Sequence, residues 1–232
     1  MVEVIAMLTN QDRTVPDARD VFLAAARAPT DYWGFKDTAI SDENAVRLAE
    51  AIRGEGKKLV FESFAESEND CLKAARFAIE QDCALFIGCA YHASVVALLD
   101  GTPVRYMPTF GRRSGVPRLL YGSRQEIMHD AREVLDGGAH GLCLSMYRYQ
   151  DGSPEELALA VSERMRPSPV VVTGSINSFS RLKAVREIGP WALTVGTALF
   201  EEAFGSGLDW AEQLAVMRAV LTLSPANSLR SS

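Results

Sequence analysis

The chain has 232 residues, of which 47% are apolar and 23% are charged, and its net charge is −6. This composition is ordinary for a globular protein of one domain, and a chain of this length buries enough surface to fold without a metal ion or disulfides. The acidic balance argues against a nucleic-acid or anionic-membrane surface, which needs a basic face, but not against binding one small anion.

The first half of the chain alternates short apolar runs with amphipathic stretches. Val2–Leu8 is the first predicted strand, and Thr14 with Asp17 forms a plausible capping box for a helix through Ala28. The same order then repeats three times. The predicted strands and their helices lie at 32–35 and 41–53, at 59–64 and 67–80, and at 84–87 with a short helix to about 99.

The second half continues the alternation after a turn at 100–103. Ser123 and Glu126 are typical of a helix start, and Ser153 followed by Pro154 is another. The predicted strands are 104–107, 141–146, 170–173 and 192–195, and the predicted helices start at 123, 153, 179 and 209.

Eight strand–helix units in a chain of this length indicate a closed parallel barrel. The competing fold is an open doubly wound sheet, which usually has fewer strands and a glycine fingerprint after the first strand. The segment that follows the first strand here, residues 8–12, contains no glycine. We therefore predict an α/β fold, a single (β/α)₈ TIM barrel over residues 1–223, and a disordered tail at 224–232.

Two glycine turns end the last two predicted strands. The seventh strand runs into Gly174-Ser175 and the eighth into Gly196-Thr197. The loops after these strands often bind phosphate in such barrels, because glycine lets the backbone approach an anion and the following N–H groups and hydroxyls donate to it. A short helix over 197–204 would add its positive end. We expect all four residues to bind a phosphate group; the alternative is that the glycines only end the strands.

The residues around these turns resemble those of a known group of barrels. Val-Thr-Gly-Ser-Ile-Asn-Ser-Phe (172–179), followed by Ala-Leu-Thr-Val-Gly-Thr-Ala-Leu-Phe-Glu (192–201), is similar to the phosphate-binding half of the ribulose-phosphate-binding TIM-barrel superfamily. That superfamily includes phosphoribosyl isomerases, sugar-phosphate epimerases and decarboxylases, and the resemblance implies that the four turn residues are phosphate ligands. Tyr-Trp-Gly-Phe-Lys-Asp (32–37) also resembles a segment of a group of bacterial barrels, without implying an activity.

Ionisable side chains at strand ends should face the barrel mouth, where such barrels carry out their chemistry. Lys36 ends the second predicted strand and Glu62 lies in the third, and we predict that they form the catalytic pair. A lysine there can act as a base, form a Schiff base or stabilise an enediolate oxygen, and a carboxylate can move the proton. The alternative is a structural ion pair at the rim. His92, after the fourth strand, is a third catalytic candidate.

Two segments depart from the best-known members of that superfamily. Asp12 occupies roughly the place of the first-strand acid of the phosphoribosyl isomerases, but Thr9-Asn10-Gln11 stands where an acid would end the strand. The decarboxylases carry Asp-x-Lys on their third strand, and the segment here is Phe-Glu-Ser-Phe (61–64). These departures argue against decarboxylation and against a direct transfer of the isomerase mechanism.

The longest loop between a strand and a helix, residues 108–118, carries arginines among glycines and prolines. Arginine binds carboxylates and phosphates, and glycines make a loop mobile. We predict a lid over an anionic substrate with Arg112 and Arg113 as its anion ligands, and Arg148, after the sixth strand, as a third. The alternative is a solvated surface loop or a subunit contact.

The favoured function is an isomerase or epimerase that moves a proton next to the carbonyl of a sugar phosphate or similar compound. The alternatives are a Schiff-base aldolase (a lyase) with Lys36 as nucleophile and a non-catalytic barrel that binds a phosphorylated metabolite. We predict no metal site and no cofactor, apart from Mg²⁺ that the substrate brings, because no metal-ligand spacing is present. Expected partners are a phosphorylated small molecule and a second copy in a homodimer, without nucleic acid or membrane. The start lacks a signal peptide, which predicts a cytoplasmic protein.

Overall fold

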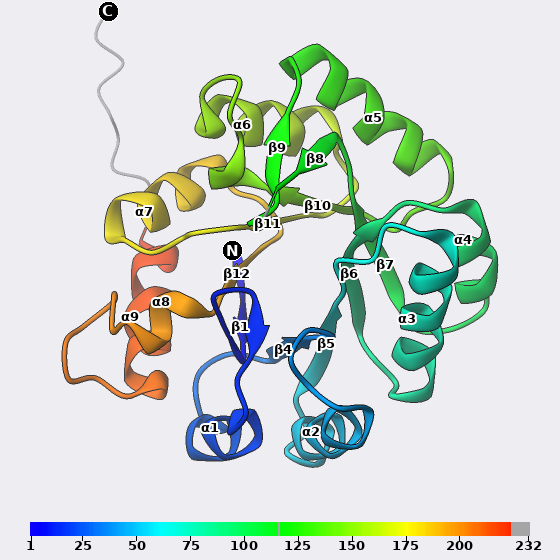
Figure 1. Cartoon of the computed structure of the whole chain (residues 1–232). Coiled ribbons are helices and arrows are strands. Elements are labelled where there is room, and N and C mark those ends of the chain that lie inside the picture. Colours follow the sequence, from blue (N-terminus) through cyan, green and yellow to red (C-terminus); the bar gives the residue numbers. More distant parts are fainter. Residues whose placement is uncertain (116, 224–232) are drawn as a thin grey trace, which may run out of the picture.

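In the computed structural model, which describes residues 1–115 and 117–223, eight parallel strands close into a barrel (Figure 1). Going around it, the strands are β1 (Glu3–Met7), β12 (Ala192–Val195), β11 (Val170–Thr173), β10 (Leu142–Ser145), β7 (Arg105–Thr109), β6 (Leu85–Ala90), β5 (Lys58–Glu62) and β4 (Tyr32–Lys36). The predicted (β/α)₈ barrel is confirmed. The tail predicted at 224–232 lies outside the described residues.

Helices surround the barrel in Figure 1. They are α1 (Ala18–Ala25), α2 (Asp42–Gly54), α3 (Glu68–Glu80), α4 (Ala93–Leu99), α5 (Arg124–Asp136), the 3₁₀ turn η1 (Met146–Arg148), α6 (Pro154–Arg164), α7 (Phe179–Ile188), α8 (Thr197–Phe200) and α9 (Trp210–Thr222). Ser123 and Glu126 form the expected capping box, and Ser153 caps α6 ahead of Pro154. Among the described residues, no helix has both the length and the apolar character that crossing a membrane requires.

Alternating side chains divide each strand between two packing regions. One set of strand residues packs outward against the helices, and the other fills the barrel with residues such as Ile5, Val60 and Val171. At the carboxyl ends of the strands the inward-facing side chains become polar. They form a buried or half-buried layer made of Lys36, Glu62, Thr109, Ser145, Thr173 and Thr194. This layer is the floor of the barrel mouth.

A small hairpin interrupts the path from β1 to α1. Strands β2 (Thr9–Asn10) and β3 (Arg13–Thr14) pair antiparallel, and the turn residues Gln11 and Asp12 have φ values of 48° and 64°. Positive φ at both turn residues is the two-residue hairpin geometry whose twist matches that of the strands. The capping box predicted at Thr14 is wrong, because this residue belongs to β3 and its hydroxyl donates to the Lys36 carbonyl at 2.7 Å.

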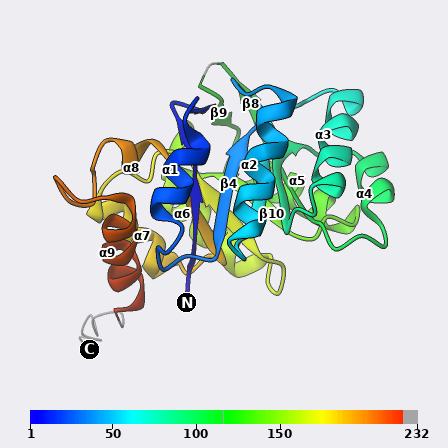
Figure 2. The same ribbon diagram turned by 90° about the horizontal axis from the view of Figure 1, so that it is seen from below.

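A second hairpin occupies the segment predicted to be a mobile loop. Strands β8 (Arg112–Ser114) and β9 (Leu119–Tyr121) pair antiparallel, and Leu120 is buried. The Leu120 carbonyl also accepts a hydrogen bond from Gln150 N at 3.0 Å. In Figure 2 this hairpin stands at the end of the barrel opposite to the N-terminus. The described residues of this segment therefore form a hairpin beside the barrel mouth, and the lid predicted from the sequence stays a prediction.

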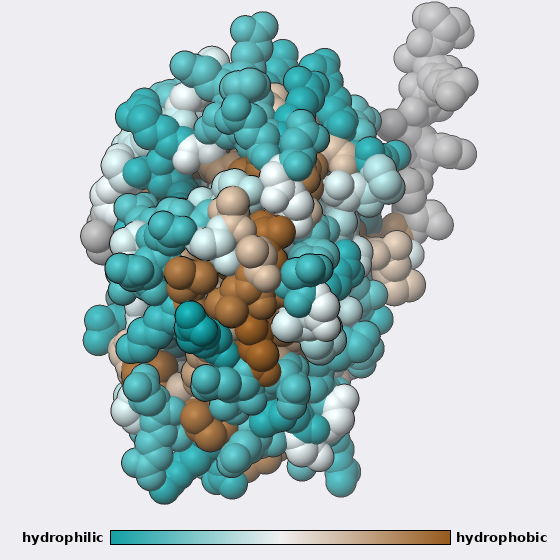
Figure 3. Space-filling view, turned by 90° about the vertical axis from the view of Figure 1, so that its right-hand side faces the viewer, coloured by the Kyte–Doolittle hydropathy of each residue, from teal (hydrophilic) through white to brown (hydrophobic). Residues whose placement is uncertain are grey.

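One side of the molecule shows an apolar strip between hydrophilic side chains (Figure 3). This is the side of α3 and α4, where Leu72, Val96 and Leu98 are only partly buried. Helix α4 has seven residues, about two turns, and so covers its part of the barrel less completely than the longer helices do. The homodimer expected from the sequence stays a prediction.

Candidate active site

A cavity of about 520 Å³ opens at the carboxyl ends of the strands. It is lined by charged side chains after β1, β4 and β5, by the turns after β11 and β12, and by part of the β8–β9 hairpin. Its volume lies within the range of about 300–1,000 Å³ that is usual for small-molecule sites. The sequence placed the site at this end, and the cavity lies there.

Lys36 and Glu62 face each other in the floor of the cavity. They are register partners on the neighbouring strands β4 and β5, so both point into the barrel. Lys36 Nζ lies 3.5 Å from Glu62 Oε1, and both side chains are buried. The ring of Phe64 lies 4.0 Å from Lys36 Nζ and shields the ammonium group. The pair predicted from the sequence is thus brought together.

A glycine on the neighbouring strand provides the space that Glu62 occupies. Gly88 in β6 has a φ of 92°, and a Cβ atom there would lie 2.8 Å from Glu62 Cγ and 2.9 Å from the Ser63 carbonyl oxygen. The register between β6 and β7 shifts between Ile87 and Ala90, as expected for a bulge. A side chain at position 88 would displace the Glu62 carboxylate from Lys36.

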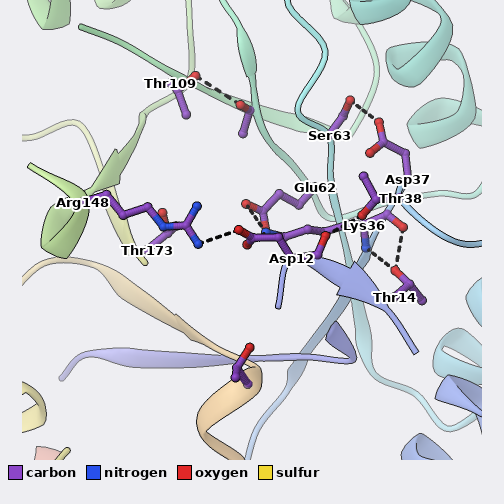
Figure 4. Close-up of polar contacts among 12 residues, drawn as sticks. Asp12, Thr14, Lys36, Asp37, Thr38, Glu62, Ser63, Thr109, Arg148 and Thr173 are labelled. Atoms are coloured by element: carbon purple, nitrogen blue, oxygen red, sulfur yellow. Dashed lines mark hydrogen bonds and ion pairs between the residues drawn. The ribbon is translucent and has the colours of Figure 1, made fainter. Parts of the chain in front are cut away.

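Asp12 is closer to Lys36 than Glu62 is, and the predicted site did not include it. Its Oδ1 lies 2.7 Å from Lys36 Nζ, and its Oδ2 accepts a hydrogen bond from Arg148 Nη2 at 2.7 Å (Figure 4). The β2–β3 hairpin places it there, because the turn folds the chain back over the mouth after β1. The Thr38 hydroxyl donates to the Asp12 carbonyl at 2.6 Å and holds the turn in position.

The environments of the two carboxylates shift their pKa values in opposite directions. Burial opposes ionisation of Asp12, but the charges and hydrogen bonds of Lys36 and Arg148 outweigh it and hold the pKa of Asp12 below its usual value. Burial raises the pKa of Glu62 despite the opposing charge of Lys36, and the Asp12 charge adds to the rise. A pair of acids with separated pKa values is suited to acid–base chemistry.

The two glycine turns form the part of the cavity wall that follows β11 and β12, next to β1. Gly174 and Ser175 have φ values of 86° and 57°, and α8 begins directly after Gly196. The first N–H groups of a helix have no acceptor within it, so those at Thr197 and Ala198 are free of intrahelical bonds beside the cavity. The short helix predicted over 197–204 is present, with bounds Thr197–Phe200.

Only glycine fits at position 196. A Cβ atom there would lie 2.7 Å from the Thr9 carbonyl oxygen and 3.1 Å from the Met7 carbonyl oxygen. The turn after β12 therefore packs directly against the backbone that leaves β1. Gln11 N also donates to the Thr197 hydroxyl at 2.8 Å. The glycine turn and the hairpin that carries Asp12 thus support each other.

The remaining predicted residues divide between the cavity and the surface. Arg113 and Arg148 line the cavity, whereas Arg112 and His92 do not belong to its lining. Arg112 is exposed, with its guanidinium 5.2 Å from the centre of the Tyr121 ring. His92 Nε2 lies 2.9 Å from the backbone carbonyl oxygen of residue 66 and joins two loops outside the cavity. Both stay catalytic or binding candidates on sequence grounds only.

Metal ligands do not gather in the part of the chain that the structure describes: no group of three or more His, Cys, Asp or Glu side chains there could hold a metal ion. Asp12 and Glu62 are the carboxylates next to Lys36, and both are engaged by its ammonium group. The chemical groups that the cavity offers a ligand are a lysine, arginines, carboxylates and backbone N–H groups.

No protein-family model and no curated protein matches the sequence. Among solved structures, the chain is similar to the orotidine 5′-phosphate decarboxylase from Pyrococcus horikoshii, with a TM-score of 0.71 and 11% identity over 95% of this chain and 100% of that one. It is similar to the thiamine phosphate pyrophosphorylase from Pyrococcus furiosus, with a TM-score of 0.66 and 12% identity over 95% of each chain.

An aldolase is also among the similar structures. The 4-hydroxy-2-oxoglutarate/2-dehydro-3-deoxyphosphogluconate aldolase from TTHB1 has a TM-score of 0.62 and 17% identity over 94% of each chain. These similarities show that the chain shares the TIM-barrel fold, and at identities of 11–17% they show nothing beyond the fold. Fold does not determine reaction, so function has to be argued from the site.

Proposed function

We propose that the protein is an isomerase or epimerase that acts on a sugar phosphate or a similar phosphorylated carbonyl compound. The observation that carries the proposal is the placement of Lys36, between Asp12 at 2.7 Å and Glu62 at 3.5 Å, in the same cavity as the two glycine turns. One wall offers backbone N–H groups for a phosphate, and the other offers an ammonium group between two acids.

The phosphate would sit between the turns at Gly174 and Gly196. Ser175 and Thr197 add hydroxyl groups, and Thr197 and Ala198, the first residues of α8, line the cavity with N–H groups that could donate to the same anion. The resemblance of this segment to the ribulose-phosphate-binding superfamily supports this placement. Two of the similar structures also carry names of phosphorylated compounds, orotidine 5′-phosphate and thiamine phosphate.

We call the part of the cavity that carries Asp12, Lys36 and Glu62 the charged wall. These side chains would transfer the proton next to the substrate carbonyl. Lys36 donates a hydrogen bond to the carbonyl oxygen, and the Asp12 carboxylate takes a proton from the adjacent carbon. The electron pair of that C–H bond forms the carbon–carbon double bond of an enediolate, whose negative oxygen Lys36 stabilises. In an isomerase, Asp12 then returns the proton to the former carbonyl carbon, and the hydroxyl proton of the neighbouring carbon passes to the former carbonyl oxygen, so that the carbonyl group moves to that neighbouring carbon. In an epimerase, Glu62 delivers its own proton to the opposite face of the same carbon.

The test has two stages. A thermal-shift screen compares phosphorylated sugars with their dephosphorylated counterparts, and we expect only the phosphorylated compounds to raise the melting temperature. The best compound is then assayed for turnover with the wild type and with Gly174→Asp, whose carboxylate would repel the phosphate. Unchanged protection of Gly174→Asp by that compound would refute the phosphate site.

The second candidate is a Schiff-base aldolase, which the aldolase among the similar structures favours. Here the Lys36 amine adds to the substrate carbonyl, and loss of water leaves an iminium that withdraws electrons from the carbon–carbon bond to be broken. Borohydride reduction in the presence of the best carbonyl compound separates the candidates. A stable adduct on Lys36, located by mass spectrometry, supports the aldolase, and its absence supports the isomerase.

A non-catalytic binding barrel is the third candidate. It predicts that Lys36→Ala and Glu62→Ala bind the phosphorylated compound as tightly as the wild type, with no turnover in any of the three proteins. Turnover by the wild type that both variants lose would exclude it.

A further inference from the structure

Arg113 reaches the cavity from the side opposite to the two glycine turns. It lies on β8 opposite Leu120, whose burial anchors the hairpin. Its Nη1 donates to the carbonyl of Gly88, two residues before the carboxyl end of β6, at 3.3 Å. In the barrel order, three strands separate β6 from β12 in either direction. Arg113 and Gly196 therefore stand across the mouth from each other.

Arg113 differs from the other cations that line the cavity. Lys36 and Arg148 pair with Asp12, and Arg118 pairs with Glu66. Within residues 1–115 and 117–223, Arg113 makes no ion pair, and its guanidinium bonds to a neutral carbonyl. Burial lowers the pKa of Arg113, so the folded protein holds this charge at a cost that an anionic ligand would offset.

We propose that the substrate carries a carboxylate at the end opposite to its phosphate, and that Arg113 binds this carboxylate. The inference rests on the proposed phosphate site and adds a second anchor to it. A planar guanidinium matches a carboxylate through two parallel hydrogen bonds. One guanidinium also balances the single charge of a carboxylate, whereas the phosphate end offers several N–H groups and hydroxyls.

This second anchor explains how the reacting carbons reach the charged wall. Strands β1, β4 and β5 lie between β12 and β6 on one side of the barrel. A molecule held at both ends across the mouth has its middle carbons beside Asp12, Lys36 and Glu62, which follow or end these strands. The substrate class is thus a phosphorylated hydroxy acid or keto acid whose reacting carbonyl lies between its two acidic ends.

Matched pairs of compounds test the carboxylate directly. Isothermal titration calorimetry would compare 3-phosphoglycerate, 4-phosphoerythronate and 6-phosphogluconate with glycerol 3-phosphate, erythritol 4-phosphate and sorbitol 6-phosphate. Each pair has the same carbon chain and differs in the carboxylate. For the pair whose length spans the mouth, we expect the wild type to bind the acid about tenfold or more tightly than the polyol phosphate.

The variants locate the preference. Arg113→Gln should lose the preference for the acid and keep the affinity for the polyol phosphate. Arg124→Gln, an exposed residue at the start of α5 outside the cavity lining, should keep both the preference and the affinity. Arg113→Lys retains the charge without the planar fork and should show an intermediate preference. The melting temperature of Arg113→Gln without ligand shows whether this variant folds. If it does not fold, Arg113→Lys tests the preference for the acid in its place.

Three results would overturn the inference while leaving the phosphate site intact. They are equal affinity of the wild type for both members of every pair, an equal loss for both members in Arg113→Gln, and tighter binding of fructose 1,6-bisphosphate than of 6-phosphogluconate. Failure of the wild type to bind any phosphate ester would instead refute the phosphate site and the two-ended substrate together.

Discussion

The two walls of the cavity are built from different materials. The wall after β11 and β12 consists of backbone N–H groups and hydroxyls in two consecutive strand–turn segments, 170–177 and 192–200. The wall after β1, β4 and β5 consists of charged side chains that come from separate units and neutralise one another in ion pairs. The first wall depends on local chain geometry, whereas the second depends on how the strands come together. The two should therefore respond differently to mutation and to pH.

Removing the ammonium group should have the largest effect. Lys36→Met leaves the partly buried Asp12 without the ammonium group that lies 2.7 Å from its Oδ1, and breaking a buried ion pair by removing one partner costs about 3–5 kcal/mol of unfolding free energy. Turnover of the best phosphorylated compound should fall about a thousandfold or more, because the carbonyl loses its hydrogen-bond donor. Urea unfolding and initial rates measure the two losses.

Lys58→Met is the matched control, since Lys58 begins the same strand as Glu62 but is exposed and lies beside Tyr32 at the other end of the barrel. We expect its unfolding free energy to stay within about 0.5 kcal/mol of the wild type. Equal costs for the two lysine variants would show that the charged wall is not a coupled buried cluster.

The two carboxylates should give opposite pH dependences of stability. Asp12 has a lowered pKa, so its ionised form contributes stability above its unfolded pKa of about 4, and this contribution is lost as the pH falls through the folded pKa. Asp12→Asn should cost about 1.5–3 kcal/mol at neutral pH. The difference from the wild type should shrink as the pH is lowered.

Glu62 has a raised pKa, so the sign reverses. Its contribution is present below its unfolded pKa of about 4.3 and is lost as the pH rises through the folded pKa. Glu62→Gln should therefore gain stability relative to the wild type as the pH rises. Urea unfolding of the three proteins between about pH 3 and pH 8 measures both trends, and parallel curves for the two variants would contradict the assignment.

The glycine wall should respond to added volume at a single position. Gly196→Ala places a Cβ atom 2.7 Å from the Thr9 carbonyl oxygen, and overpacking of this kind costs about 1–3 kcal/mol. The rise in melting temperature that a phosphorylated compound gives should also be smaller in Gly196→Ala than in the wild type. Gly54→Ala is the control, because no atom lies within 4 Å of the added Cβ and alanine in a helix should stabilise by about 0.5–1 kcal/mol.

The smallest effect is expected where the two walls meet. Thr197→Val removes the hydroxyl that accepts from Gln11 N at 2.8 Å, a loss of about 1 kcal/mol. If this hydrogen bond positions the β2–β3 hairpin, the variant should also turn over substrate more slowly. The stability of the barrel core, measured by hydrogen exchange of the amides in β5 and β11, should stay unchanged. Thr222→Val, whose hydroxyl bonds within its own helix, should change neither quantity.

The sequence predicted the barrel and the glycine wall because both are local patterns. Alternation of strands and helices, the caps at Ser123 and Ser153, and the turns at Gly174 and Gly196 each involve residues that lie close together in the chain. The proximity of Lys36 and Glu62 could also be predicted from the sequence, because the ends of neighbouring parallel strands lie side by side at the same end of the barrel.

Asp12 was weighed from the sequence but left out of the predicted site, because the hairpin that turns it toward Lys36 has no sequence signal. Two-residue hairpin turns are usually marked by Asn-Gly or Asp-Gly, and here Gln11 and Asp12 adopt positive φ without any glycine. The strands beside them have two residues each, too few for an alternating pattern. For the same reason the sequence did not predict the β8–β9 hairpin. The exposed position of Arg112 could not be predicted either, because it depends on the pairing of Arg112 with Tyr121 in that hairpin.

Exchange of carbon-bound hydrogen with solvent tests the central claim most directly. The best-binding phosphorylated carbonyl compound is incubated in D₂O with the wild type, Lys36→Met or Asp12→Asn, and deuterium at the carbon next to the carbonyl is followed by NMR. We predict incorporation with the wild type and at least a hundredfold slower incorporation with both variants. No exchange by the wild type, or equal exchange in Lys36→Met, would contradict proton transfer at the charged wall.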